Sequence, residues 1–141
     1  MLPHSDQKVM RNLILIIDDE FIILESLRIQ LERFLPEDVE VEAAYSGEEA
    51  VELLGDIAAA GWNLLVVVSD YNLGDAKGTE VLIKVKEMFP LTRRILLSGQ
   101  AGSDEEIEAF IKETSLDLFL SKPWDLAELR SKIETYLGER T

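Results

Sequence analysis

Short apolar runs alternate along this chain with longer stretches whose apolar residues recur at helical spacing. Residues 13–17 and 64–68 are wholly apolar, which is typical of strands buried on both faces of a sheet. Residues 39–43 alternate apolar and acidic side chains and predict an edge or half-covered strand. Two further strands are expected at 95–97 and 116–120. The pattern therefore predicts five strands.

A helix is expected after each strand, because the intervening apolar residues recur at intervals of three and four. The first of these helices runs through 23–34 and ends before Pro36. Three others begin at capping pairs: Ser46 with Glu49, Ser103 with Glu106, and Asp125 with Glu128. Strict alternation of strand and helix predicts an α/β fold, a doubly wound five-stranded parallel sheet with helices on both faces.

The chain has 141 residues, enough for one ordinary domain. Residues 1–11 show no sustained periodicity and are expected to form a flexible N-terminal tail. The folded domain is expected over residues 12–138, followed by a short tail at 139–141.

The chain is strongly acidic, with a net charge of −14. This charge disfavours direct binding to nucleic acid and to anionic membranes, since both carry negative phosphates. The absence of cysteine and the single histidine, His4, exclude thiolate chemistry and histidine-based triads or metal clusters. No apolar run reaches the roughly 18 residues of a membrane span, and the N-terminus does not resemble a signal peptide. A cytoplasmic location is expected.

Polar residues that could bind a ligand or take part in a reaction follow four of the predicted strands. They are Asp18 and Asp19, Asp70, Ser98, and Lys122. In parallel sheets, ligands bind at the carboxyl ends of the strands. Adjacent carboxylates at a buried strand end favour a hard divalent cation such as Mg²⁺, which prefers oxygen ligands. A carboxylate beside such an ion can attack phosphorus to form an aspartyl phosphate, with a lysine stabilising the phosphoryl oxygens. The pattern predicts a phosphoryl-acceptor site.

Four segments of the chain resemble the receiver domains of two-component response regulators. These segments are Ile16–Glu20, Val68–Leu73, Ile95–Gly99 and Phe119–Pro123. Each is weak alone, but the four occur in the family's order and each lies at a predicted strand end. The resemblance extends from about residue 12 to residue 137.

This resemblance implies that Asp70 accepts a phosphoryl group from a sensor histidine kinase or a phosphotransfer protein. It implies that Asp19, Asp70 and the backbone carbonyl of Asn72 ligate Mg²⁺, while Asp18 acts on the ion through water. Such a domain is a signalling module, and not an enzyme acting on a separate substrate.

The resemblance also implies roles for residues at the ends of the last two strands. Ser98 and Lys122 would contact the phosphoryl group, and Ser98 and Phe119 would form the switch that reports activation. The Lys122–Pro123 peptide bond is expected to be cis. The switched face would bind a downstream effector protein or an output domain outside this chain, and a homodimer is a further possibility.

Two positions after the third strand depart from the family. Gly74 stands where proline is common, and Lys77 stands where aspartate or asparagine is common. Glycine loses more entropy on ordering, so a more mobile loop is expected. Lys77 places a cation near the site.

Other interpretations remain open beside the receiver. One is a receiver-like module that binds proteins without phosphorylation. This interpretation requires the altered loop, with Gly74 and Lys77, to prevent phosphorylation although the reacting residues are present. A haloacid-dehalogenase-like phosphatase would need a second aspartate where this chain has Asn72. A flavodoxin-like cofactor binder would need a phosphate-binding loop where this chain has three acidic residues, 18–20. Asp18 and Asp19 are also compatible with a helix N-cap and first-turn acid.

Overall fold

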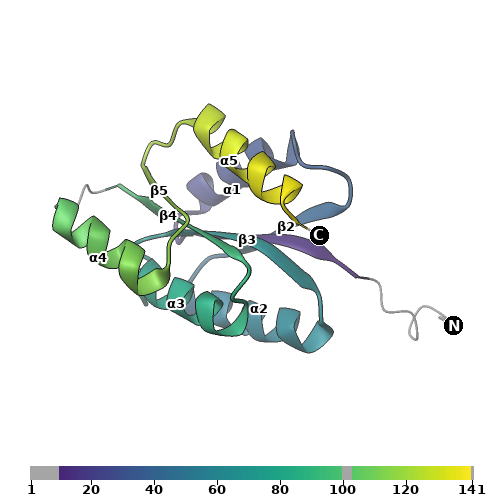
Figure 1. Ribbon diagram of the computed structural model, residues 1–141, viewed down its shortest axis with the longest axis horizontal. Coiled ribbons are helices and arrows are strands. Elements are labelled where there is room, and N and C mark those ends of the chain that lie inside the picture. The colour runs from purple at the N-terminus through teal and green to yellow at the C-terminus, as the bar shows by residue number, and fades with distance from the viewer. Residues whose placement is uncertain (1–9, 100–102, 141) are drawn as a thin grey trace, which may run out of the picture.

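The computed structural model describes residues 10–99 and 103–140, in which strands and helices alternate as predicted (Figure 1). The described elements are β1 (Asn12–Ile17), α1 (Phe21–Glu32), β2 (Val39–Ala44), α2 (Gly47–Ala60), β3 (Asn63–Asp70), α3 (Gly78–Met88), β4 (Arg93–Ser98), α4 (Asp104–Thr114), β5 (Leu118–Ser121) and α5 (Leu126–Gly138). Most of the expected N-terminal tail, residues 1–9, lies outside the described residues, as does Thr141. None of the described helices is both long enough and apolar enough to cross a lipid bilayer.

The described strands form one parallel sheet in the order β2-β1-β3-β4-β5. From β1 the chain continues to β2, at one edge of the sheet. From β3 it continues through β4 to β5, at the opposite edge. The topological switch point therefore lies between the carboxyl ends of β1 and β3, where ligands bind in sheets of this kind. β2 lies at an edge of the sheet, as its alternating pattern predicts.

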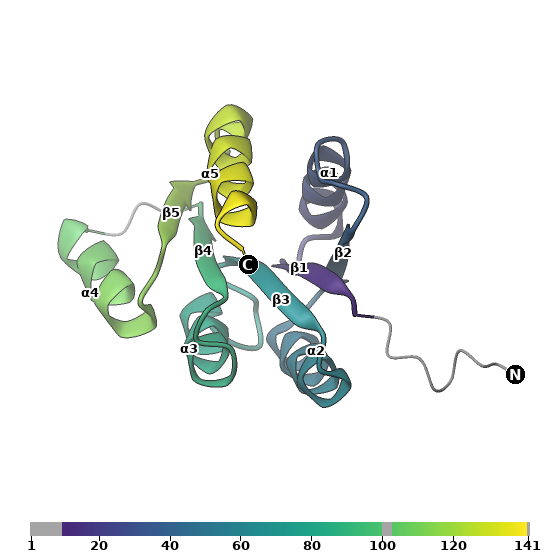
Figure 2. The ribbon, with the colours of Figure 1, turned by 45° about the vertical axis from the view of Figure 1, so that its right-hand side comes forward.

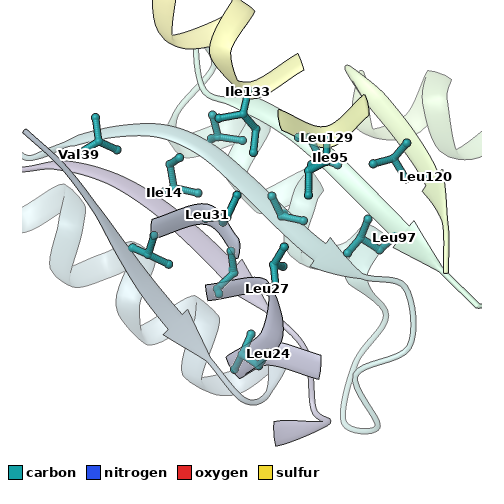
Figure 3. Close-up of a cluster of buried hydrophobic side chains, with 14 of the residues drawn as sticks. Ile14, Leu24, Leu27, Leu31, Val39, Ile95, Leu97, Leu120, Leu129 and Ile133 are labelled. Carbon is teal, nitrogen blue, oxygen red and sulfur yellow. The ribbon is translucent and has the colours of Figure 1, made fainter. Parts of the chain in front are cut away.

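The two faces of the sheet carry separate hydrophobic cores. Ile14 and Ile16 of β1 belong to the core beneath α1 and α5, while Leu13, Leu15 and Ile17 belong to the core against α2 and α3. Figure 2 shows these helix pairs on opposite faces of the sheet, and Figure 3 shows side chains of the first core. Because successive strand residues point to opposite faces, a strand covered on both sides must be apolar throughout.

The three predicted capping pairs begin their helices. In each, the side-chain oxygen of the first residue accepts a hydrogen bond from the backbone N–H three residues later: Ser46 from Glu49 at 3.0 Å, Ser103 from Glu106 at 3.2 Å, and Asp125 from Glu128 at 3.2 Å. Each bond satisfies a backbone donor that has no partner within the helix.

β5 begins two residues later than expected, because Leu116 completes the end of α4. The backbone N–H of Leu116 donates to the carbonyl of Ile111, after Ser115 adopts a left-handed conformation with φ of 51°. Leu116 is therefore unable to use the same N–H in the sheet, and the strand starts at Leu118.

Residues expected in the two tails contribute to the folded domain. Arg11 pairs with Glu40 and Glu42 of the edge strand at 3.0 and 2.7 Å, and its carbonyl accepts from the N–H of Asn63. At the other end of the chain, Glu139 pairs with Arg93, and Arg140 pairs with Asp38, both at 3.1 Å.

Candidate functional site

A cleft of about 300 Å³ opens at the carboxyl ends of the strands, at the switch point of the sheet. Its lining includes five of the residues predicted from sequence: Asp19, Asp70, Asn72, Ser98 and Lys122. Glu20, Tyr71, Lys77 and Gly99 complete it. The structure thus brings together side chains from the ends of β1, β3, β4 and β5.

Three carboxylates meet in this region. Asp18, Asp19 and Asp70 each offer an oxygen, and these oxygens all lie within 4.8 Å of one another. Asp18 is 2% exposed and Asp70 7% exposed, whereas Asp19 is open to solvent. Negative charges this close repel, and burial makes the repulsion costly. An all-oxygen donor set that is partly buried and partly open to water fits Mg²⁺.

The positive charge of Lys122 partly neutralises the three carboxylates. Its ammonium nitrogen lies 2.7 Å from Oδ2 of Asp18 and 3.1 Å from Oδ1 of Asp70. The backbone N–H of Lys122 donates to the carbonyl of Ser98 at 2.8 Å, which fixes the end of β5 beside the end of β4. Burial alone would lower the pKa of Lys122, but the two carboxylates outweigh it and raise the pKa above its ordinary value.

The environment of Asp70 disfavours its ionised form. Burial raises the pKa of Asp70 above its ordinary value, and the negative charge of Asp18 adds to this effect. The hydrogen bond and positive charge of Lys122 act in the opposite direction without cancelling it. A cation bound in the cleft would favour the ionised carboxylate, which is the nucleophilic form.

Asp18 serves both the backbone and the site. Its Oδ1 accepts the N–H of Glu20 at 2.9 Å, just before α1, while its Oδ2 pairs with Lys122. The helix-capping interpretation of Asp18 and Asp19 is wrong: the N-cap of α1 is Glu20, the first turn of the helix holds no acidic residue, and Asp18 accepts its hydrogen bond in the turn before the helix.

The loop between β3 and α3 is a hydrogen-bonded turn. Asn72 and Lys77 pair across it as an antiparallel bridge, and Oδ1 of Asn72 accepts the N–H of Gly74 at 3.1 Å. Gly74 has φ of +82°, a left-handed conformation closed to proline, whose ring fixes φ near −65°. Glycine here selects a different turn from the one that the family's usual proline allows.

Asp75 ties this loop to α2, a contact that the sequence analysis did not predict. Its two carboxylate oxygens accept the backbone N–H groups of Gly47 and Glu48, each at 2.9 Å. These bonds lower the pKa of Asp75 below its ordinary value. No local pattern links residue 75 with residue 47, so the contact follows only from the fold.

Gly78 is a second residue whose role emerges from the structure. A Cβ atom at this position would collide with the carbonyl oxygen of Asp70. The N–H of Gly78 also donates to the carbonyl of Tyr71 at 2.6 Å. Gly78 is the first residue of α3, and the close approach of this helix to the end of β3 depends on the missing side chain.

Ser98 lines the cleft, but Phe119 does not. Phe119 pairs with Leu96 in the β4–β5 register and is half-buried against the core of α2 and α3. The Lys122–Pro123 peptide bond is cis.

Comparisons with known proteins point to one family. The family model described as response regulator receiver domain matches residues 14–134. A hydrogenase transcriptional regulatory protein, HoxA of Bradyrhizobium diazoefficiens, is 32% identical over 117 residues, covering 82% of this chain and 22% of HoxA. The chain spans between about a fifth and about half of the length of the first curated relatives it matches.

Two solved structures are similar to this chain over nearly the full length of both proteins. The signal receiver domain of an HD domain-containing protein from Pseudomonas fluorescens is 29% identical, with a TM-score of 0.77, over 91% of this chain and 95% of that one. A CheY-like response regulator receiver domain protein from Methanospirillum hungatei is also 29% identical, with a TM-score of 0.76, over 93% and 96%.

Proposed function

The chain belongs to the response regulator receiver domain family of two-component systems, and on that premise we propose that it accepts a phosphoryl group on Asp70 in a Mg²⁺-dependent reaction. The observation that carries this proposal is the convergence of three carboxylates and Lys122 at the switch point of the sheet. The donor is a sensor histidine kinase or a phosphotransfer protein, and the reaction takes place in the cytoplasm.

In the proposed transfer, a carboxylate oxygen of Asp70 attacks the phosphorus of a phosphohistidine. A new P–O bond forms, the P–N bond breaks, and its electron pair leaves with the imidazole nitrogen of the donor. Lys122 exchanges its contact with Asp70 for one with the transferred phosphoryl oxygens. The hydroxyl group of Ser98, which lines the same cleft, donates a hydrogen bond to those oxygens.

The residues that would hold Mg²⁺ are Asp19, Asp70 and the backbone carbonyl of Asn72, with Asp18 acting through water. When bound, the ion supplies positive charge that offsets the phosphoryl oxygens. Both oxygens of Asp18 already have partners, the N–H of Glu20 and the ammonium of Lys122, which supports a contact through water, whereas Asp19 is exposed and open to direct contact.

Phosphorylation then changes the face that partners recognise. Movement of Ser98 toward the phosphoryl group gives Phe119 room to turn inward, which shifts the population of the face formed by the last two strand–helix units, β4–α4 and β5–α5. This face binds a downstream effector, an output domain or a second copy of the chain. The protein thus acts as a switch and not as an enzyme on a separate substrate.

Intact-protein mass after incubation with acetyl phosphate and Mg²⁺ tests this proposal. We expect the wild-type chain to gain the mass of one phosphoryl group, and Asp70→Asn and a metal-free sample to gain none. Asp56→Asn, which makes the same chemical change on the exposed side of α2, should react like the wild type. No gain by the wild type would favour a receiver-like module that binds partners without phosphorylation.

A further inference from the structure

The candidate site holds a second lysine that the proposed mechanism does not use. Lys77 lines the same cleft as Asp70 and Lys122. The other charged residues of the lining are the acidic Asp19 and Glu20. An anionic phosphoryl donor must therefore enter a cleft whose own carboxylates repel it, on a chain of net charge −14.

The two lysines of the cleft differ in what already neutralises them. Lys122 is in contact with both Asp18 and Asp70. Among the ion pairs of the described residues, Lys77 has no carboxylate partner. Its charge is available to an incoming anion, whereas that of Lys122 is already shared between two carboxylates.

An aromatic ring holds the Lys77 ammonium at the cleft. The nitrogen lies 5.3 Å from the ring centroid of Tyr71, within the range of a cation–π interaction. Tyr71 directly follows Asp70, and its ring packs 5.0 Å from the ring of Phe110 in α4. Tyr71 is thus supported from behind and keeps the ammonium beside the residue that accepts the phosphoryl group.

Helix α3 gains nothing from a lysine at this position. Lys77 is the N-cap residue, and its side chain accepts no hydrogen bond from the helix. Serine, threonine, aspartate and asparagine are the residues preferred at this position, and a cation is unfavourable at the positive end of a helix. The local structure therefore disfavours lysine, which leaves the cleft as the place where its charge is useful.

We propose that Lys77 is a substrate-binding residue that attracts the phosphoryl donor and contacts its anionic oxygens in the cleft that it shares with Lys122. The chemical class of the ligand is a phosphoryl dianion with a good leaving group, such as an acyl phosphate or a phosphohistidine. This inference rests on the proposed function, because it concerns the donor of that same transfer.

Initial rates of phosphorylation by acetyl phosphate with Mg²⁺ test the role of Lys77. We expect Lys77→Met, which removes the charge and keeps the length, to lower the second-order rate constant about three- to tenfold at low salt. Lys77→Arg should restore most of the rate. Lys84→Met removes the same charge from an exposed position of α3 outside the cleft and should react like the wild type.

Salt distinguishes an electrostatic role from a structural one. Added NaCl should slow the wild type and Lys77→Arg more than Lys77→Met, so that the three rates converge. Equal rates for Lys77→Met and Lys84→Met, or failure of Lys77→Arg to restore the rate, would overturn the role of Lys77 and leave the proposed function standing. A wild type that takes up no phosphoryl group would overturn both.

Discussion

At the scale of single residues, the strand ends combine structural and chemical tasks. The carbonyl of Asp70 lies against Gly78, while its side chain faces Lys122 and the cleft. Any change that pushes α3 away from β3 therefore also moves the carboxylate that we propose as nucleophile. Gly78 is in this sense part of the site, although it has no side chain to offer.

Substituting Gly78 tests this steric requirement. We expect Gly78→Ala to lower the free energy of unfolding by about 2–3 kcal/mol, because the added methyl group forces α3 away from β3. Chemical denaturation measures the change. The matched control is Gly55→Ala in the exposed middle of α2, where an added Cβ meets no atom within 4 Å. That substitution should raise the stability by about 0.5–1 kcal/mol, since glycine disfavours a helix interior.

If the contact with Asp70 is what makes Gly78→Ala destabilising, the two glycine variants change the free energy of unfolding in opposite directions. A Gly78→Ala protein as stable as the wild type would show that α3 moves aside at little cost. The close approach seen between Gly78 and Asp70 would then not be required for folding.

At the scale of elements, the β3–α3 loop links the site to α2. Asp75 holds the first N–H groups of α2, and its neighbours Asn72 and Lys77 line the cleft. The loop is thus supported by a helix that contributes nothing to the chemistry. The expectation that Gly74 makes the loop mobile must be set against this support.

The contact between Asp75 and α2 has a defined pH dependence. Because the N–H groups of Gly47 and Glu48 lower the pKa of folded Asp75, the carboxylate stabilises the fold fully above its ordinary value of 3.8. This contribution is lost as the pH falls through the lower pKa of the folded state. We expect Asp75→Asn to lower the melting temperature at pH 7, and the difference from the wild type to shrink below pH 3.8.

Thermal melts of Asp75→Asn and Asp56→Asn across this pH range distinguish the effect of the lost hydrogen bonds on stability from the effect of the changed net charge. Asp56 is exposed on α2, so its substitution removes the same charge elsewhere. If the two variants melt alike at pH 7, the hydrogen bonds of Asp75 contribute no stability.

The order of elements was predictable because its signals are local. Apolar periodicity indicated each strand and helix, and Ser46, Ser103 and Asp125 cap helices as expected. The start of β5 was wrong because the chain reversal after α4 takes up the N–H of Leu116, an interaction that competes with the sheet. The link from Asp75 to α2 depends on tertiary contact alone.

At the scale of the whole molecule, the gathering of site residues followed from topology. Parallel strands place their carboxyl ends at one edge, so Asp70, Ser98 and Lys122 meet there despite their distance in sequence. The sequence also placed Lys77 near the site, but strand order did not predict that its ammonium would lie over the ring of Tyr71. Their placement depends on side-chain packing that strand order does not determine.

Stability is unevenly distributed over this architecture. α1 and α5 each bury three leucine or isoleucine side chains, whereas Thr114 is the buried residue of α4 among the residues described. α4 also precedes β5, a short strand at the edge of the sheet. Because buried apolar area resists local opening, α4 and β5 should open more easily than the rest of the domain.

Hydrogen exchange monitored by mass spectrometry tests this gradient and its link to the site. We expect amides of α4 to exchange at least about tenfold faster than those of α1 and α5, because fewer apolar side chains hold the helix closed. Acetyl phosphate with Mg²⁺ should slow exchange in α4 and β5, since Ser98 and Lys122 then share a ligand at the ends of β4 and β5. Asp70→Asn should show no such slowing. If α4 exchanged as slowly as α1, or responded equally in Asp70→Asn, the switch that we propose would have to lie in another part of the domain.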